Sequence, residues 1–195
     1  MLPLLIITGL CLVLPLLHGL YTSLKVGIPL SELLKSQLQT FLVGFSTASC
    51  AATFDTNVEC CEKKLHIDEK LVRFDIPFGQ VLFKSGIIVT FVILVLYMAK
   101  QNAVPITPAW IVTMVIVVPI LAVAVPTIPG GMLSCVQVLF TQLSIPTSSL
   151  AISATVLTFS DYACSACNIV CLQQSLLICA KKLGLLKHEW KKTEP

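Results

Sequence analysis

Charged side chains are scarce in this sequence. Only 12% of its 195 residues are Asp, Glu, Lys or Arg, whereas a water-soluble domain usually carries about 25% charge. So few charges cannot cover a water-facing surface, which excludes an ordinary soluble fold. Hydrophobic residues make up 56% of the chain, and its mean hydropathy is +0.91. The composition therefore predicts an integral membrane protein, and the formal net charge of +3 gives no reason to expect a nucleic-acid partner.

The motifs of common enzymes are also missing. The sequence has no HExxH metal site, no phosphate-binding glycine-rich loop ending in lysine, and no pairing of a cysteine with a histidine. Asp161 is the only acidic residue that lies clearly inside an apolar run, and catalysis usually needs a partner group. We therefore expect no enzymatic activity and no cofactor other than a coupling ion.

Cysteine, in contrast, is abundant, with nine residues in the chain. The odd number, mostly within apolar runs, argues against a framework of disulfides. Cys164, Cys167 and Cys171 have a spacing that resembles metal ligands, but the same spacing places all three on one face of a helix. We favour their use as small residues at a helix contact over a metal site.

Three long apolar segments predict membrane-spanning helices, which need about 20 residues each. They cover residues 1–25, 77–99 and 148–180. For the first of them a signal peptide is the alternative, but a signal peptide has a basic segment before a shorter apolar core. No basic residue precedes the apolar run at residues 2–24, so we favour a helix that spans the membrane.

Two further segments, residues 29–64 and 109–143, predict helical hairpins that enter and leave the membrane on the same side. The first joins an amphipathic helix over residues 30–43 to a run of small and hydroxyl residues over 45–53. The second is apolar for about 35 residues, too few for two full spans of about 20 residues each. Its middle holds the helix breakers Pro119, Pro126, Pro129, Gly130 and Gly131. Irregular backbone survives at membrane depth only where protein or water shelters it, so both tips are predicted to line a binding site.

The positions of the basic residues agree with this arrangement. If both hairpins are re-entrant, residues 25–35, residues 55–75 and the basic tail 181–195 lie on one side and hold two, four and five of the thirteen Lys and Arg residues. Such residues collect on the cytoplasmic side, so we expect a multi-pass protein of the plasma membrane with a cytoplasmic C-terminus. The order of hairpin and then span occurs twice, which predicts an inverted repeat. The expected fold is all-α, with about three transmembrane helices and two re-entrant helical hairpins.

Four motifs, in this order, resemble the C-terminal half of the dicarboxylate/amino acid:cation symporter family, the glutamate transporter homologues, over residues 20–184. Residues 45–53, Phe-Ser-Thr-Ala-Ser-Cys-Ala-Ala-Thr, are similar to the serine-rich tip of that family's first hairpin. Ile76-Pro77-Phe78-Gly79 resembles the start of its seventh helix. Ile128-Pro129-Gly130-Gly131 resembles the tip of its second hairpin, and the segment from Asp161 to Asn168 resembles the polar face of its eighth helix. The resemblance implies that residues 1–195 form part of a transport domain, without the family's earlier helices.

The resemblance also implies a substrate site between the two hairpin tips and the last span. Backbone groups of the tips would hold the α-carboxylate of an amino acid, and Asp161 would pair with its ammonium group. An arginine that holds a side-chain carboxylate in many family members aligns with Cys164, which implies a small neutral substrate. The substrate-binding residues so implied are Ser49, Cys50, Ala51, Ile128, Pro129, Gly130, Gly131, Asp161, Cys164, Ser165 and Asn168.

The family's sodium ligands, however, are largely replaced. Its Asn-Met-Asp-Gly-Thr motif aligns with Phe83-Lys84-Ser85-Gly86-Ile87, and a later sodium-binding aspartate aligns with Leu172. The coupling ion is left open between sodium and a proton. We expect Lys84 to replace one bound sodium with a fixed charge; the alternative is that it extends to the membrane interface. The positions implied as ion-binding, or as a substitute charge, are Gly79, Lys84, Ser85 and Asn168.

Two functions follow from these observations. The first is a secondary active transporter, a symporter, of an amino acid or dicarboxylate, with a small neutral amino acid favoured and the second hairpin as the gate. The second is a truncated or degenerate family member that does not transport and assembles as a membrane subunit with other chains. The expected partners are a small-molecule substrate, the lipid bilayer, and either a missing N-terminal half or further copies of the chain.

Overall fold

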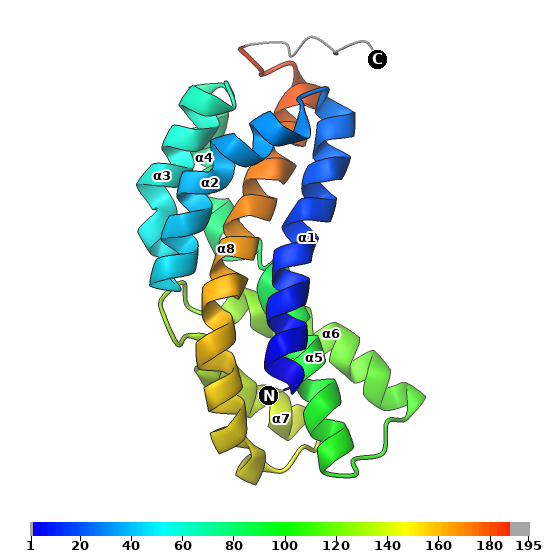
Figure 1. The fold of residues 1–195 in the computed structure, drawn as a ribbon. Helices are drawn as coiled ribbons and strands as arrows, with labels where there is room; N and C mark the ends of the chain where they lie inside the picture. Colours follow the sequence, from blue (N-terminus) through cyan, green and yellow to red (C-terminus); the bar gives the residue numbers. More distant parts are fainter. Residues whose placement is uncertain (1, 188–195) are drawn as a thin grey trace.

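The computed structural model describes residues 2–187, and all of its regular elements in that range are helices (Figure 1). The α-helices are α1 (Leu2–Val26), α2 (Leu30–Thr47), α3 (Phe54–Glu59), α4 (Glu69–Leu82), α5 (Ser85–Gln101), α6 (Pro108–Ala124), α7 (Met132–Gln142) and α8 (Leu150–Leu183). Short 3₁₀ turns at Ala51–Thr53 and Thr147–Ser149 and a π turn at Cys60–Lys64 complete them. Residues 188–195 of the predicted basic tail lie outside the described residues.

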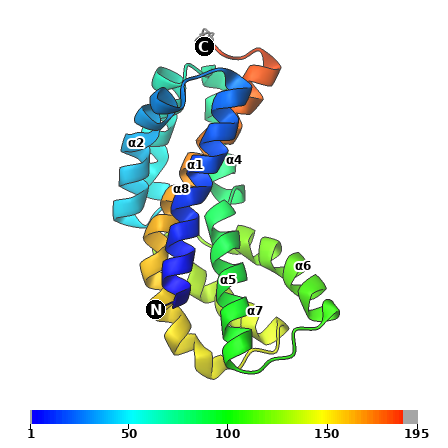
Figure 2. The same ribbon diagram turned by 45° about the vertical axis from the view of Figure 1, so that its right-hand side comes forward.

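Helix α8 is the axis of the fold. It runs the length of the molecule and packs against α1 and α2, which flank it in Figure 1, and against α5 beside its lower half (Figures 1 and 2). Its 34 residues contain neither proline nor glycine, and it ends at Gly184, whose φ of +68° is the left-handed conformation that favours glycine. Its central position explains why so many of its polar side chains are buried.

Three helical segments within residues 2–187 are long and apolar enough to cross a membrane: Leu2–Val26, Glu69–Gln101 and Thr147–Leu183. The prediction of about three such helices is thereby confirmed by length and composition. Much of α1 faces outward, and its exposed side chains are almost all large and apolar, as a surface against lipid requires.

The middle segment differs from the continuous span expected at residues 77–99. Helix α4 ends at Leu82, α5 begins at Ser85, and Phe83 and Lys84 between them are not helical. The break is stabilised from α8, because Asn168 Oδ1 accepts a hydrogen bond of 2.7 Å from the backbone N–H of Gly86 in the first turn of α5. A side chain far away in the sequence thus satisfies one of the N–H groups that a helix start leaves without a partner.

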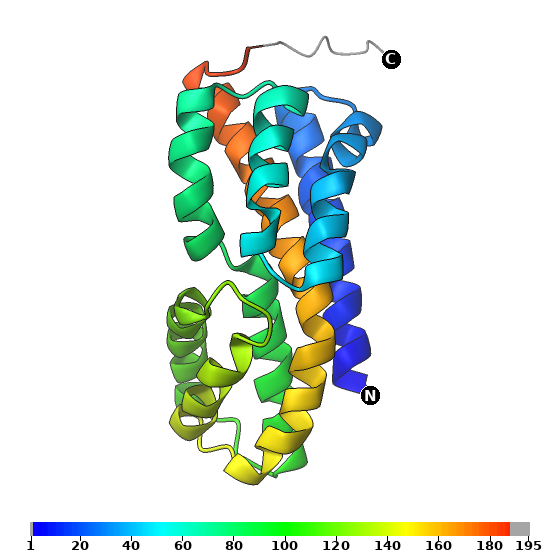
Figure 3. The same cartoon turned by 90° about the vertical axis from the view of Figure 1, so that its left-hand side faces the viewer.

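Two helical hairpins fill the remaining volume. Helix α2 packs beside α3, and α6 packs beside α7, so that each pair forms a tip at its turn (Figure 3). The first tip follows Ala48, whose φ of 50° ends α2, and the second contains Gly130 at φ +76°. The predicted segments 29–64 and 109–143 contain these two hairpins almost completely.

A buried polar network joins α1, α2 and α8. Gln174 Oε1 lies 2.9 Å from Nδ1 of His18, and Gln174 Nε2 donates to the carbonyl of Pro15 and to Oε1 of Gln37, each at 3.1 Å. Gln37 Nε2 in turn donates to the carbonyl of Val170 at 3.3 Å. Because buried amide groups are costly unless they are paired, this network fixes the register of α1 and α2 on α8.

Candidate functional site

The two hairpin tips touch one another at the middle of the molecule (Figure 3). Ser49 Oγ donates a hydrogen bond of 3.1 Å to the carbonyl oxygen of Thr127, and the backbone N–H of Ala51 reaches the same oxygen at 3.4 Å. These contacts join turns that are 78 residues apart in the sequence. The tips therefore close against each other through hydrogen bonds to a single carbonyl oxygen, that of Thr127.

Asp161 of α8 lies directly behind the second tip. Its Oδ2 accepts a hydrogen bond of 2.9 Å from the backbone N–H of Gly130, and Ser165 Oγ, one turn further along α8, donates to Oδ1 at 3.5 Å. The carboxylate is only 7% exposed. The second tip thus supplies a charge-assisted hydrogen bond to a buried carboxylate.

Asn168 continues the same face of α8, because positions i, i+4 and i+7 share one side of a helix. Its Oδ1 is taken by Gly86 N, and its Nδ2 points toward two sulfur atoms, Cys164 Sγ at 3.9 Å and Cys50 Sγ at 4.0 Å. Asn168 thus connects the first hairpin tip, the break before α5 and α8. Asn168 therefore stabilises the start of α5 and also lines the cavity.

Lys84 enters this region from the break between α4 and α5. Its side chain is 3% exposed, and its Nζ has no hydrogen-bond partner among the described residues. It lines the same cavity as Asp161, Ser165 and Asn168. The prediction that it could extend to the membrane interface is therefore wrong, because its ammonium group is enclosed by protein.

The cavity that these groups share is very small, about 10 Å³. A space of that size is about the minimum for a single water molecule, so an amino acid enters only if the tips move apart. Its lining combines the two tips, the start of α5 and α8; the residues are Ala48, Cys50, Lys84, Ile87, Val125, Pro126, Thr127, Ile128, Met132, Asp161, Ser165 and Asn168. The site is closed in this structure.

The structure brings most of the predicted site residues to this place, with clear exceptions. Cys164 is fully buried against Asn168 and α5 and does not line the cavity. Gly79 packs against the side chain of Leu172, and Ser85 Oγ lies 3.9 Å from Cys167 Sγ, so neither lines the cavity. Pro129 and Gly131 shape the second tip, and Ser49 and Ala51 act across the tip contact.

Two residues of the site could not be read from side-chain patterns. Thr127 takes part through its carbonyl oxygen, which every residue type offers. Gly86 is needed for a close approach: a Cβ atom there would lie 2.7 Å from the carbonyl oxygen of Cys164. The sequence signal for this contact was that Gly86 aligns with the glycine of the family's Asn-Met-Asp-Gly-Thr motif.

We expect Gly86→Ala to destabilise the protein by about 1–3 kcal/mol, because the added methyl group meets backbone that cannot move aside. Gly9→Ala is the matched control, since a Cβ at Gly9 in α1 has nothing within 4 Å and alanine favours a helix. The midpoint of thermal unfolding of the purified protein in detergent measures both. Equal midpoints for the two variants would contradict the close approach of α5 and α8.

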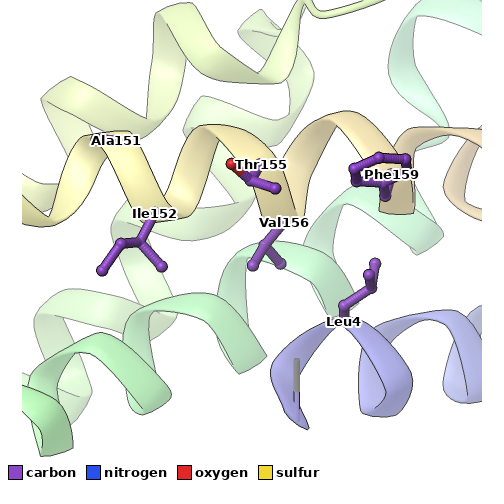
Figure 4. A pocket seen from close by; sticks show the side chains of 6 residues that line it. All are labelled: Leu4, Ala151, Ile152, Thr155, Val156 and Phe159. Atoms are coloured by element: carbon purple, nitrogen blue, oxygen red, sulfur yellow. The ribbon is translucent and has the colours of Figure 1, made fainter.

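A larger cavity, about 550 Å³, lies elsewhere, between the start of α1 and the first turns of α8 (Figure 4). None of the six described residues that line it carries a charge, and Thr155 supplies its only side-chain hydroxyl. Leu4, Val156 and Phe159 form apolar walls. An amino acid or a dicarboxylate would find no partner for its charges there, so this cavity is not the polar site.

The fold and the site define a membrane protein with a buried polar centre closed by two hairpin tips. The sequence model of the sodium:dicarboxylate symporter family matches residues 1–181, and the chain belongs to that family. The resemblance noted from the motifs is thereby confirmed.

Individual relatives are distant. The chain is 25% identical to human excitatory amino acid transporter 2 over 132 residues, which are 68% of this chain and 23% of that protein. It is 23% identical to human neutral amino acid transporter A over 158 residues, 81% of this chain and 29% of that protein. It is 25% identical to mouse excitatory amino acid transporter 5 over 146 residues, which are 75% of this chain and 25% of that protein. The chain thus spans about a quarter of the length of these relatives.

Proposed function

We propose that this chain forms the substrate site of a secondary active transporter for an amino acid or dicarboxylate, with a small neutral amino acid as the preferred substrate. One observation carries the proposal: the second hairpin tip closes on a buried carboxylate, through the hydrogen bond from Gly130 N to Asp161. When the tip opens, Asp161 loses this donor and is free to bind the ammonium group of a substrate. The substrate and the tip therefore compete for the same oxygen atoms, which couples binding to gating.

The preferred substrate follows from the charges around the cavity. Its lining contains one carboxylate and one ammonium group, those of Asp161 and Lys84, which match the two charges of a neutral amino acid. A dicarboxylate would bring a second negative charge close to Asp161. The relatives include both excitatory and neutral amino acid transporters, so a neutral substrate agrees with the names of some of them.

Both hairpins are proposed to be re-entrant and to enter from opposite faces of the plasma membrane, as an inverted repeat. In this arrangement the non-helical backbone of each tip is covered by α8 and by the other tip, as backbone at membrane depth requires. The C-terminus lies in the cytoplasm together with the basic residues that flank α2 and α3.

The name of the family identifies sodium as its coupling ion. We propose that Lys84 takes the place of one bound sodium in this chain. In its protonated form, the Lys84 side chain places a positive charge at the cavity that Asn168 also lines. The remaining coupling ion is then sodium or a proton. This arrangement predicts a shallow dependence of uptake on sodium concentration, because fewer sodium ions bind for each substrate molecule.

Uptake of radiolabelled amino acids and dicarboxylates into proteoliposomes tests these proposals. We expect uptake of small neutral amino acids that exceeds uptake of dicarboxylates, with a sodium dependence no steeper than first order. A steep dependence would contradict the role of Lys84 but leave transport intact. No uptake of any of these compounds would contradict transport by this chain alone and favour a non-transporting subunit that assembles with other chains.

A further inference from the structure

We propose that Lys84 Nζ binds the carboxylate of the substrate, so that the site holds a zwitterion between two opposite charges, Lys84 and Asp161. This inference rests on the proposed function and gives it a specific chemistry. It differs from the expectation that tip backbone alone holds the carboxylate. It also assigns a ligand to a side chain that the closed structure leaves without one.

The first argument is the cost of the unpaired charge. The ammonium group of Lys84 is 3% exposed and has no hydrogen-bond partner among the described residues. A buried charge without a partner is strongly unfavourable, and in proteins such groups are normally paired. A substrate carboxylate beside Lys84 Nζ would supply the partner that the closed structure lacks.

The second argument is that Asp161 does not serve as that anion. Within residues 2–187 no ion pair joins Lys84 to Asp161. The carboxylate already accepts hydrogen bonds from Gly130 N and Ser165 Oγ. The two opposite charges thus line one cavity without pairing, so that each stays available to a zwitterion that enters when the tips move apart.

The third argument is the backbone around Lys84. The residue precedes the 17-residue helix α5, whose first turn has no side-chain cap from Lys84 itself. The start of a helix carries a partial positive charge and backbone N–H groups that bind anions. Gly86 N is occupied by Asn168, but Ile87 in the same turn lines the cavity. The helix start and the ammonium group therefore favour a carboxylate at the same place.

A comparison of L-alanine with L-alaninamide tests this directly, because the amide keeps the size and the ammonium group but lacks the carboxylate. Binding of each compound to the purified full-length chain is measured by competition with radiolabelled L-alanine. We expect the wild type to prefer alanine by about 30-fold or more, the loss typical when one partner of a buried charge pair is removed. Lys84→Met should bind the two compounds with affinities within about threefold of each other.

Three further variants serve as controls. Lys84→Arg keeps the charge and should keep the preference for alanine, whereas Lys84→Gln keeps donors without the charge and should lose it. Lys100→Met removes an exposed lysine at the end of α5 and should behave as the wild type. Lys84→Met should also melt no lower than the wild type, because an unpaired buried charge is removed.

Each outcome supports or overturns the inference. A Lys84→Met variant that keeps the wild-type preference for alanine overturns the inference. This includes a variant whose affinities for both compounds fall by the same factor at an unchanged melting temperature. If the wild type itself binds neither compound, the inference and the proposed function fail together. If the wild type binds alanine and Lys84→Met retains the full preference, only the inference fails.

Discussion

Asp161→Ala is expected to reduce amino-acid uptake by about 100-fold or more in proteoliposomes, because truncation of one partner of a buried charge pair costs several kcal/mol. The alanine removes the acceptor for the substrate ammonium group. It also removes the acceptor for Gly130 N, so the second tip loses this hydrogen bond to α8. Uptake by this variant at the wild-type rate would contradict the assignment of the site.

Asp161→Asn separates these two effects. The amide oxygen still accepts from Gly130 N, so the tip can close, but the negative charge for the ammonium group is gone. We expect uptake to be lost in both variants, while only the alanine variant opens the tip. The buried Cys50 reports on tip closure, since a maleimide should label it faster in the alanine variant. Mass spectrometry of the labelled peptide distinguishes it from the exposed Cys179.

Asn168→Leu is expected to lower the thermal midpoint by about 2–12 °C and to abolish uptake. Leucine has no acceptor, so the N–H of Gly86 remains buried without a partner, at a cost of about 1–3 kcal/mol. The break between α4 and α5 then loses its link to α8. Thermal unfolding in detergent and uptake in proteoliposomes measure the two consequences.

Asn168→Asp is the matched variant for this prediction. Its carboxylate can still accept from Gly86 N, and a negative charge at the start of α5 is favoured by the helix dipole. We expect the thermal midpoint of Asn168→Asp to lie near that of the wild type. Its uptake should change, because the variant lacks the Nδ2 group that faces the two sulfur atoms. Equal midpoints for the leucine and aspartate variants would contradict the structural role of the asparagine side chain.

The sequence predicted the long helices well because burial in lipid depends on composition alone. An apolar run such as residues 2–24 has only one favourable environment, whatever its neighbours are. The break at Phe83 and Lys84 was not predictable in this way. It depends on a hydrogen bond from Gly86 to Asn168, and such a contact between distant segments leaves no local pattern.

The candidate site was predictable to the extent that its chemistry resides in side chains. Asp161 and Asn168 are conspicuous because polar residues are rare inside an apolar run. Cys164 was expected to line the site, but its side chain is fully buried with Sγ 3.9 Å from Asn168 Nδ2, and its backbone packs against Gly86 of α5. Backbone groups such as the carbonyl of Thr127 are invisible to any reading of residue types.

The polar network around Gln174 has a consequence for the synthesis of the chain. His18 and its partner Gln174 are 156 residues apart. At about 5–20 residues per second, α1 is made roughly 8–30 s before the helix that satisfies its histidine. During that interval α1 can already pack against α2 and α5, but His18 has no Gln174 to pair with. The hydrogen bonds that fix the register of α1 are therefore completed last, when α8 arrives.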